Sequence, residues 1–343
     1  MTQVAIVGAS GYAGAELIRI VHSHPDLNLG VIAAGSNAGA SLATLHPQFS
    51  SVPELAHLVF SATEPAALAQ SDLIFLALPH GESAELAAQL PATARIVDLG
   101  ADFRLADSAA WEKYYGGTHA GQWTYGLPEL HGVRAQIASA TRIANPGCYA
   151  TAIQLALAPL LADQIAQPDD VIVVAASGTS GAGRSARVNL LGSEVMGSMS
   201  PYKVGGTHQH TPEIEQSLSA IAGAPVQVNF TPMLAPMSRG ILATVSVKTA
   251  ASESQLRDSL TQYFAGEVFV TVLPVGQLPA TSSTYGSNAV HIQVAKDDRM
   301  GRATVLVALD NLVKGAAGQA VQNANLMFGY DETAGLTSIG VAP

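Results

Sequence analysis

A glycine-rich loop near the N-terminus constrains the fold of this chain more than any other feature. The loop Gly8–Gly14 reads GASGYAG and joins an apolar run, Val4–Val7, to a helical pattern, Ala13–Val21. Glycines here permit a tight turn and let backbone N–H groups at the helix start approach a pyrophosphate. The spacing is GxxGxxG rather than GxGxxG, so a glycine turn that binds nothing is the alternative. The strand–loop–helix context favours a dinucleotide site that contains Gly8, Ser10, Gly11, Tyr12 and Gly14.

Short apolar runs and helical patterns alternate through the first half of the chain, as they do in the βαβ units of a parallel sheet. The expected strands are Val4–Val7, Leu29–Ala33, Leu73–Leu78 and Ile96–Leu99. The second half differs, because the small-residue segment 177–199 is followed by strand-like runs such as Ile241–Val247 with partial alternation. Partial alternation suits a mixed or antiparallel sheet. At 343 residues, the chain is therefore expected to be an α/β protein of two domains.

Composition limits the possible partners. The formal charge of −10 and the absence of any basic run disfavour binding to nucleic acid or to an anionic membrane. The longest apolar stretch, Ala150–Ala162, is too short to cross a bilayer. The chain has one cysteine, which cannot form an internal disulfide and fits a reducing compartment. We expect a cytoplasmic location.

The segment after the second expected strand bears on the choice of nucleotide. Residues 33–39 read AAGSNAG and include no acidic residue. An NAD enzyme usually places an acid there, on the ribose hydroxyls. Its absence removes a repulsion against the extra phosphate of NADP, and the side chains of Ser36 and Asn37 can donate to that phosphate. The sequence favours NADP(H) as cofactor.

The single cysteine, Cys148, lies between the turn Pro146-Gly147 and an apolar helical pattern. The N-terminus of a helix stabilises a thiolate and lowers the pKa of the thiol. A buried structural cysteine is the alternative, but the position at a turn favours a nucleophile.

A nucleophilic thiol needs a proton acceptor, and the pair His208 and His210 is the best candidate. Thr211 is expected to cap the next helix, which puts both histidines on its extended entry with their side chains on one side. The pair could bind a metal, but no third ligand has convincing spacing, and we expect no metal.

Three further segments offer groups for binding anions. Residues 177–184 read SGTSGAGR and resemble a backbone nest for phosphate or for the carboxamide end of a cofactor, with Ser180 and Gly181 at its centre. Arg104 and Arg239 are isolated positive charges in apolar surroundings. For each arginine, pairing with a carboxylate and binding an anionic substrate both remain open.

Taken together, these segments resemble the N-acetyl-gamma-glutamyl-phosphate reductase family, which is related to the aspartate-semialdehyde dehydrogenases. The resemblance covers nearly the whole chain. It implies a Rossmann-type parallel-sheet domain, residues 1–147 with about 311–343, and an α+β catalytic and oligomerisation domain with a mixed sheet, residues 148–310. It also implies a homodimer or homotetramer and a step of arginine biosynthesis. The motifs that carry it are GASGYAG at 8–14, ADFR at 101–104, YGLPEL at 125–130, NPGCYAT at 145–151, SGTSGAGR at 177–184, HQHTPEI at 208–214 and DNLVKGAA at 310–317.

The resemblance also implies a mechanism. The Cys148 thiolate is expected to attack the acyl carbon of N-acetyl-glutamyl 5-phosphate and expel inorganic phosphate, and NADPH then reduces the thioester to the semialdehyde. His210 is assigned as acid/base and His208 as a group that orients substrate, with the reverse also open. Glu213 is expected to orient a histidine, and Arg104 to bind the phosphoryl group. Arg184 and Arg239 are assigned to phosphate or substrate carboxylate, and Asn311 to the nicotinamide side of the cofactor.

The chain departs from many members of this family at three positions. Gly35 stands where a basic residue is common, Gly100 where a serine is common, and Gln209 where an arginine is common. The first departure concerns NADP selectivity. Alternative functions are an aminoadipyl-phosphate or aspartyl-phosphate reductase, a cysteine hydrolase or acyltransferase, and a nucleotide sensor without activity.

Overall fold

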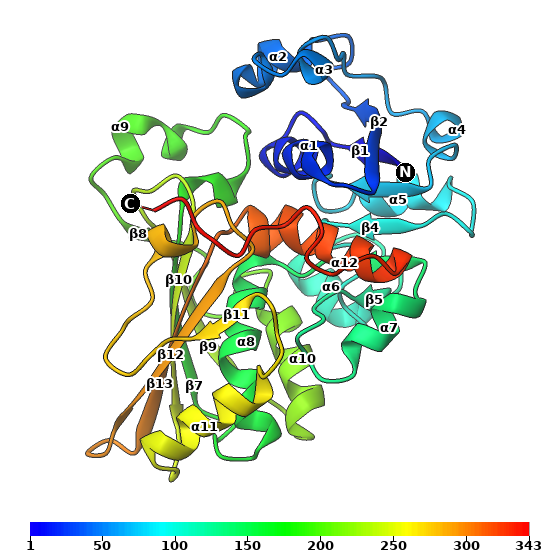
Figure 1. Cartoon of the computed structure of the whole chain (residues 1–343). Coiled ribbons are helices and arrows are strands. Elements are labelled where there is room, and N and C mark those ends of the chain that lie inside the picture. The colour runs from blue at the N-terminus through cyan, green and yellow to red at the C-terminus, as the bar shows by residue number, and fades with distance from the viewer. Residues whose placement is uncertain (343) are drawn as a thin grey trace.

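A six-stranded parallel sheet forms the first half of the fold, in a computed structural model that describes residues 1–342 (Figure 1). The strand order is β2-β1-β3-β4-β6-β5, and every pair is parallel. Val4 to Val7 of β1 are fully buried, because helices cover both faces of such a sheet. The strands are β1 Thr2–Val7, β2 Leu27–Ala33, β3 Leu73–Leu76, β4 Ile96–Asp98, β5 Thr124–Tyr125 and β6 Arg142–Ala144. The Rossmann-type sheet expected from the sequence is confirmed.

Helices connect these strands, and the first of them begins within the glycine loop, at Tyr12. Between β2 and β3 the chain forms only single turns of helix. The helices of this half are α1 Tyr12–Ser23, α2 Leu42–Leu45, α3 Pro53–Ala56, α4 Pro65–Leu68, α5 Ser83–Ala88, α6 Ser108–Tyr114 and α7 Val133–Ser139.

A mixed seven-stranded sheet, as expected, forms the second half, in the order β11-β12-β13-β10-β7-β9-β8. The pairs β7–β9 and β11–β12 are parallel and the others antiparallel. One face packs on helices, and on β7 the side chains of Ile172 and Val174 point to the opposite face, where 42% and 45% of their surface is exposed. The strands are β7 Val171–Ser177, β8 Ser200–Pro201, β9 Val228–Leu234, β10 Ile241–Lys248, β11 Val270–Val272, β12 Val290–Asp297 and β13 Arg302–Leu309.

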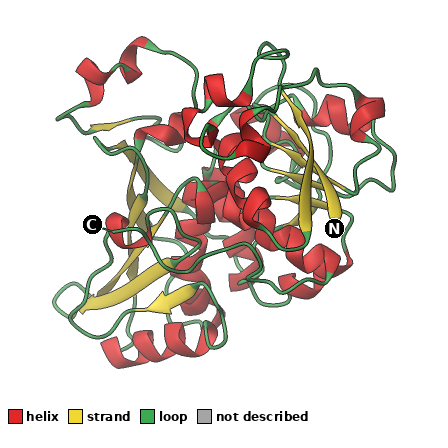
Figure 2. Cartoon of the chain, turned by 45° about the horizontal axis from the view of Figure 1, so that its top comes forward, coloured by secondary structure: helices red, strands yellow, loops and turns green. Residues whose placement is uncertain are grey.

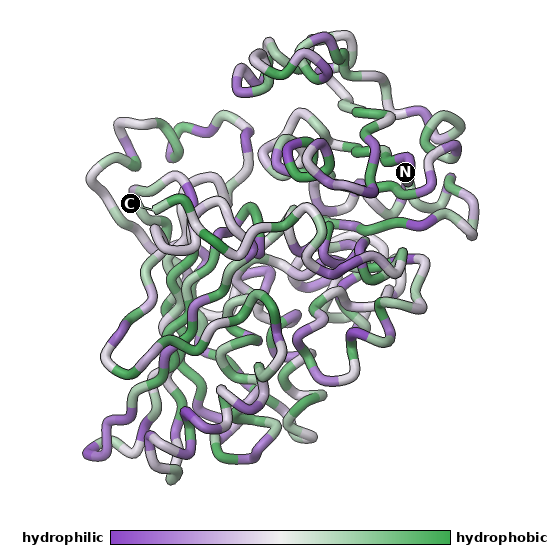
Figure 3. Tube along the Cα trace, in the orientation of Figure 1, coloured by the Kyte–Doolittle hydropathy of each residue, from purple (hydrophilic) through white to green (hydrophobic). Residues whose placement is uncertain are grey.

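Helices lie between the two sheets (Figure 2), and one of the helices on the second sheet is α8, Cys148–Ala162. It packs on β10, β13, α10 (Thr211–Ala222) and α11 (Glu253–Tyr263). Nearly all of its residues are buried, as expected for a helix that is apolar on every side. Figure 3 shows the hydrophobic stretches in this region and hydrophilic residues at the tip of the β12–β13 hairpin. The first residue of α8 therefore lies at the junction of the two halves.

The C-terminal segment returns to the first sheet. Val313, Val321 and Met327 belong to the same core cluster as residues of β1 and α1. The sequence pattern predicts one helix from Asp310 to Met327, whereas the structure has a π-helical turn, η5 (Val313–Ala317), followed by α12 (Gly318–Phe328). Such turns are rare and often lie at functional sites.

Several elements were not predicted from the sequence, among them the strands β5, β6, β8 and β11 and the helices α2, α3, α4, α6, α7 and α11. Of these, α11 has a detectable start signal, a capping box between Ser252 and Gln255. Segment 177–199 contains the short helices η2 (Thr179–Ala182), η3 (Val188–Leu190) and α9 (Gly192–Val195). Within residues 1–342, no helix has the length and apolarity needed to span a membrane.

Candidate active site

The glycine loop has the geometry of a nucleotide cradle. Gly8 has a φ of +76°, and a Cβ on it would lie 2.1 Å from the carbonyl oxygen of Ala77. A Cβ on Gly14 would lie 2.4 Å from the carbonyl oxygen of Gly8. Gly11 caps α1 without a side-chain hydrogen bond, and Tyr12 begins the helix. The loop therefore presents the N-terminus of α1 with the close backbone packing that a pyrophosphate site requires.

The segment after β2 is open and has no charged side chain. Ser36 is exposed, and a Cβ on Gly35 would have no atom within 4 Å. The Asn37 amide donates to Ser10 Oγ at 3.0 Å, which joins this segment to the glycine loop.

Asn311 and the small-residue loop also come together. The Asn311 amide nitrogen donates to Ser180 Oγ at 3.0 Å, and its oxygen accepts from the Gly240 N–H at 2.7 Å. A Cβ on Gly181 would lie 3.7 Å from the same amide nitrogen. The structure thus groups three residues that the sequence assigns to the cofactor.

Cys148 is the first residue of α8, between two glycines that allow close approach. A Cβ on Gly147 would lie 2.4 Å from His210 Nε2 and 2.9 Å from Arg104 Nη1. A Cβ on Gly315, in the π-helical turn, would lie 2.7 Å from the Cβ of Cys148. Any larger residue at either position would displace the groups around the thiol.

A buried carboxylate, that of Glu213, organises the peptide before the thiol. It accepts hydrogen bonds from the Gly147 N–H at 2.8 Å, the Tyr125 hydroxyl at 2.7 Å and Arg104 Nη1 at 3.2 Å. From the sequence, Glu213 is expected to orient a histidine. In the structure, the three partners of its side chain are Gly147, Tyr125 and Arg104. Segments far apart in the chain supply these partners, and local spacing does not reveal them.

The Arg104 side chain is 4% exposed and held from three directions. Besides Glu213, it donates from Nε to the carbonyl oxygen of Asn145 and from Nη2 to that of Leu99, each at 2.8 Å. Burial lowers its pKa, but the charge of Glu213 raises it, and the net change is upward. A guanidinium has five N–H donors, so two remain after these bonds within residues 1–342. The arginine is a fixed cation beside the thiol.

The two histidines have different surroundings. His208 is buried among the rings of Tyr149, Tyr202 and Phe230, with centroids 5.1 to 5.6 Å away. Its Nδ1 accepts the backbone N–H of His210 at 3.1 Å. Burial lowers the pKa of His208 to about 2. His208 therefore supports the backbone of His210.

His210 places Nε2 next to Gly147, the residue before the thiol. Burial and, after it, the charge of Arg104 hold its pKa well below the ordinary value, so its ring is neutral. The sequence predicts an extended entry to α10 capped by Thr211. The structure instead has His210 in a helical conformation as the N-cap and Thr211 as the first helical residue. The rings of the two histidines still lie 4.9 Å apart.

The acidity of the thiol differs from the sequence-based expectation. Burial raises the pKa of Cys148 to about 11, and the Tyr149 N–H and Arg104 lower it by less. The helix N-terminus alone would lower this pKa. In the free protein Cys148 is therefore a neutral thiol beside a neutral imidazole.

The other two predicted arginines lie on the nucleotide side. Arg239 pairs with Glu16 of α1 at 2.8 Å and with Asp310 at 3.7 Å. Arg184 donates to the carbonyl oxygens of Ser10 at 2.9 Å and Leu45 at 2.8 Å. Both arginines link the second half of the chain to the first. Both line a pocket of about 630 Å³ that also includes Tyr12 and Ser180.

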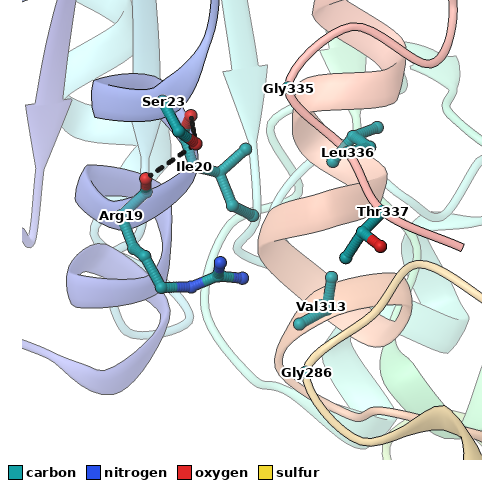
Figure 4. Close-up of a pocket in the computed structure, with 8 residues that line it drawn as sticks. All are labelled: Arg19, Ile20, Ser23, Gly286, Val313, Gly335, Leu336 and Thr337. Carbon is teal, nitrogen blue, oxygen red and sulfur yellow. Dashed lines mark hydrogen bonds between the residues drawn. The ribbon is translucent and has the colours of Figure 1, made fainter. Parts of the chain in front are cut away.

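A smaller pocket of about 310 Å³ lies between α1 and the segment Gly335–Thr337 (Figure 4). Arg19 extends from α1 toward Val313 in this view, and its guanidinium donates to Glu16. None of the residues that the sequence assigns to catalysis lines this pocket.

One cluster within residues 1–342 has the spacing of a metal-ligand set, namely Glu129, Glu267 and Glu332. Cationic side chains already occupy it. Lys314 Nζ, fully buried, lies 2.6 Å from Glu129, and Arg134 pairs with the other two carboxylates. Lys314 lies in the π-helical turn beside Gly315, so this buried pair anchors the turn that contacts Cys148.

Sequence reasoning assigned no role to Tyr125, Asn145 and Gly315, which surround the site. Tyr125 lies in a segment identified only by resemblance, and Asn145 lies directly before the turn that precedes Cys148. Gly315 lies in a stretch that fits a regular helix.

Comparison with known proteins identifies the relatives of the chain. Residues 3–140 match the family described as "Semialdehyde dehydrogenase, NAD binding domain", and residues 148–311 match "Semialdehyde dehydrogenase, dimerisation domain". The chain is 58% identical to the N-acetyl-gamma-glutamyl-phosphate reductase of Acidothermus cellulolyticus and 55% identical to that of Streptomyces coelicolor, over 99% of each chain. Among solved structures, aspartate semialdehyde dehydrogenase with NADP from Candida albicans has a similar fold. Its TM-score is 0.72 at 16% identity, covering 96% of this chain and 99% of that one.

Proposed function

Because the chain belongs to the N-acetyl-gamma-glutamyl-phosphate reductase family of semialdehyde dehydrogenases, we propose that it acts through a thioester on Cys148. The chain is an oxidoreductase that uses NADPH. It converts N-acetyl-glutamyl 5-phosphate to N-acetyl-glutamate 5-semialdehyde and inorganic phosphate, a step of arginine biosynthesis.

The arrangement around Gly147 carries this proposal. The next residue is the thiol, and a Cβ on Gly147 would lie within 3 Å of both His210 Nε2 and Arg104 Nη1. A nucleophile, a neutral base and a fixed cation thus border one peptide. Acyl transfer from an acyl phosphate, the mixed anhydride of a carboxylic acid and phosphoric acid, can use all three of these groups.

In the acylation step, His210 accepts the proton of the Cys148 thiol while the sulfur bonds to the acyl carbon. The bond from this carbon to the phosphate oxygen breaks, and His210 returns the proton to the departing phosphate. Arg104 stabilises the phosphoryl group through N–H donors that Glu213 and the two carbonyl oxygens leave available. A neutral imidazole is the form that can accept this proton, and burial beside Arg104 keeps His210 neutral.

NADPH, when bound, would supply a hydride to the thioester carbon. Breakage of the C–S bond then releases the aldehyde, and the Cys148 thiolate takes a proton from solvent. The residues that fit this cofactor are the glycine loop, with its backbone cradle at Gly8 and Gly14, and the pair Asn311 and Ser180. Asn311 holds Ser180 and Gly240 in place on the side of the second domain.

Glu213 acts as a positioning residue in this proposal. Its carboxylate holds the Gly147 peptide and the Arg104 guanidinium at once. His208 has a similar role for His210, because its Nδ1 fixes the His210 backbone. We assign Arg239 to the contact between domains rather than to substrate, because Glu16 and Asp310 neutralise its charge.

The experiment that tests this function is a substrate panel in the oxidative direction. N-acetyl-glutamate 5-semialdehyde should support steady NADP⁺ reduction only when inorganic phosphate is present, and aspartate and aminoadipate semialdehydes should support much less. Cys148→Ser should lose this turnover and keep NADP⁺ binding. Unimpaired turnover in Cys148→Ser would exclude the thioester. Equal turnover without phosphate would exclude an acyl phosphate.

The assembly is a further part of the proposal. The second half of the chain is a dimerisation domain by family, and β7 exposes Ile172 and Val174 on the sheet face that helices leave uncovered. We propose a homodimer through this face, or a homotetramer of two such dimers.

The proposed domains are residues 1–147 with the segment from about 311, and residues 148–310. The proposed location is the cytoplasm, where a lone thiol stays reduced.

A further inference from the structure

We propose that Arg184, from the second half of the chain, binds the 2′-phosphate of NADP(H) and supplies the selectivity that the end of β2 lacks. The inference deepens the proposed function, because it concerns the nucleotide site of the same reaction. It reassigns an arginine that the sequence places on phosphate or substrate carboxylate.

The segment after β2 offers the extra phosphate hydrogen bonds but no charge. Ser36 is exposed there, the Asn37 amide bonds Ser10, and Gly35 has no side chain. A phosphate monoester carries nearly two negative charges, and proteins usually meet it with a guanidinium or ammonium group. A positive charge must therefore come from another segment if the chain prefers NADP to NAD.

Arg184 brings a guanidinium to this place. Its Nη1 lies 2.9 Å from the carbonyl oxygen of Ser10, the residue whose Oγ accepts the amide of Asn37 at 3.0 Å. Its Nη2 lies 2.8 Å from the carbonyl oxygen of Leu45. Ser10 thus contacts both the guanidinium and the segment after β2. In Figure 1 the loop that carries Arg184 extends beside α1, toward α2.

The imidazole of His46 also lies near the Arg184 guanidinium, at the glycine loop. His46 Nε2 also bonds the carbonyl oxygen of Ser10, at 3.1 Å. Burial is the main cause that lowers the pKa of His46, and the charge of Arg184 lowers it further. The guanidinium therefore acts on the nucleotide side of the glycine loop.

The charge of Arg184 is available to a bound anion, whereas that of Arg239 is not. Both arginines line the same pocket, but Arg239 pairs with Glu16 and Asp310. The two hydrogen bonds of Arg184 go to neutral carbonyl oxygens, and it forms no ion pair within residues 1–342. A bound anion would give this guanidinium its charged partner. Because Arg184 and Ser10 belong to different halves of the chain, the cofactor would also tie the halves together.

The test measures binding without substrate, by titration calorimetry with NADP⁺, NAD⁺, adenosine 2′,5′-bisphosphate and AMP. Arg184→Gln should weaken NADP⁺ and the bisphosphate by about tenfold or more, the scale of one charge-assisted hydrogen bond. The affinities for NAD⁺ and AMP should change by less than about twofold, which also shows that the variant is folded. Arg187→Gln is the matched control, because it removes the same charge from the same loop and pocket without a bond to the glycine loop. It should weaken NADP⁺ and the bisphosphate much less than Arg184→Gln does.

A second variant tests the replacement of one cation by another. Gly35 is exposed and has open space for a side chain, so adding Gly35→Arg to Arg184→Gln should restore NADP⁺ affinity. An equal loss of NAD⁺ and NADP⁺ binding in Arg184→Gln would assign the arginine to the pyrophosphate and overturn the inference. Unchanged NADP⁺ binding would overturn it as well. Turnover on the acyl phosphate is measured separately, so failure of the proposed function would not be confused with either result.

Discussion

Replacement of Glu213 by glutamine separates stability from thiol chemistry. The side chain is fully buried and accepts hydrogen bonds from Gly147, Tyr125 and Arg104. Glutamine has nearly the same shape but no charge, and its NH₂ group must face at least one of these donors. The substitution therefore leaves the Arg104 guanidinium buried without its counterion.

The size of the effect follows from that burial. Removal of one partner of a buried ion pair costs about 3–5 kcal/mol of unfolding free energy. Tyr125→Phe is the matched control, because it removes one hydrogen bond to the same carboxylate and keeps the charge, at a cost of about 0.5–1.5 kcal/mol. The same substitution should have a separate effect on the pKa of the Cys148 thiol. The Glu213 charge contributes to the raised pKa of Cys148 and the Arg104 charge opposes it, so Glu213→Gln should make the thiol more acidic.

Urea unfolding gives the stability, and the rate of iodoacetamide alkylation against pH gives the thiol pKa. We expect Glu213→Gln to be alkylated faster than the parent at neutral pH, by roughly tenfold for each pKa unit lost. Turnover should nevertheless fall, because Gly147 and Arg104 are no longer held. Tyr125→Phe should show a smaller loss of stability and little change in alkylation. A thiol pKa that is unchanged or higher in Glu213→Gln would refute the assigned electrostatics.

Three other results are expected. Gly315→Ala should slow both alkylation and turnover, because the new Cβ would lie 2.7 Å from the Cβ of Cys148. It should also lower the free energy of unfolding by about 1–3 kcal/mol. Normal kinetics in the folded variant would contradict the contact. Val174→Lys should convert the oligomer to a smaller species in light scattering with the fold retained, and an unchanged mass would place the interface elsewhere. In the free parent protein the thiol is neutral below its pKa of about 11, so alkylation should rise steadily with pH from neutral to strongly alkaline solution. A plateau near neutrality would show a thiolate already formed.

The sequence predicts the parts of this structure that depend on local pattern. The glycine loop, the buried run Val4–Val7 and the helix that starts at Cys148 all follow from residue spacing and composition. The strands β5 and β6 have two and three residues, too few to show any period. The turn Val313–Ala317 looks like ordinary helix, and its π geometry depends on packing beside Cys148 and on the buried Lys314.

The site shows the same limit. Position at a helix start identifies Cys148, but that rule gives the wrong direction for the thiol pKa, because burial by distant segments outweighs the helix dipole. Spacing finds both histidines and does not separate them. Only tertiary structure shows His208 within an aromatic cluster and His210 beside Gly147. The partners of Glu213 likewise come from three separate segments.

The most direct test of the thioester is a single turnover in the oxidative direction without phosphate. The enzyme is mixed with N-acetyl-glutamate 5-semialdehyde and excess NADP⁺, and NADPH absorbance and intact mass are followed together. We predict a burst of about one NADPH per active site and one N-acetyl-glutamyl group on the peptide that contains Cys148. Added phosphate should release that group. A burst without a covalent adduct, or an adduct on another residue, would contradict the mechanism.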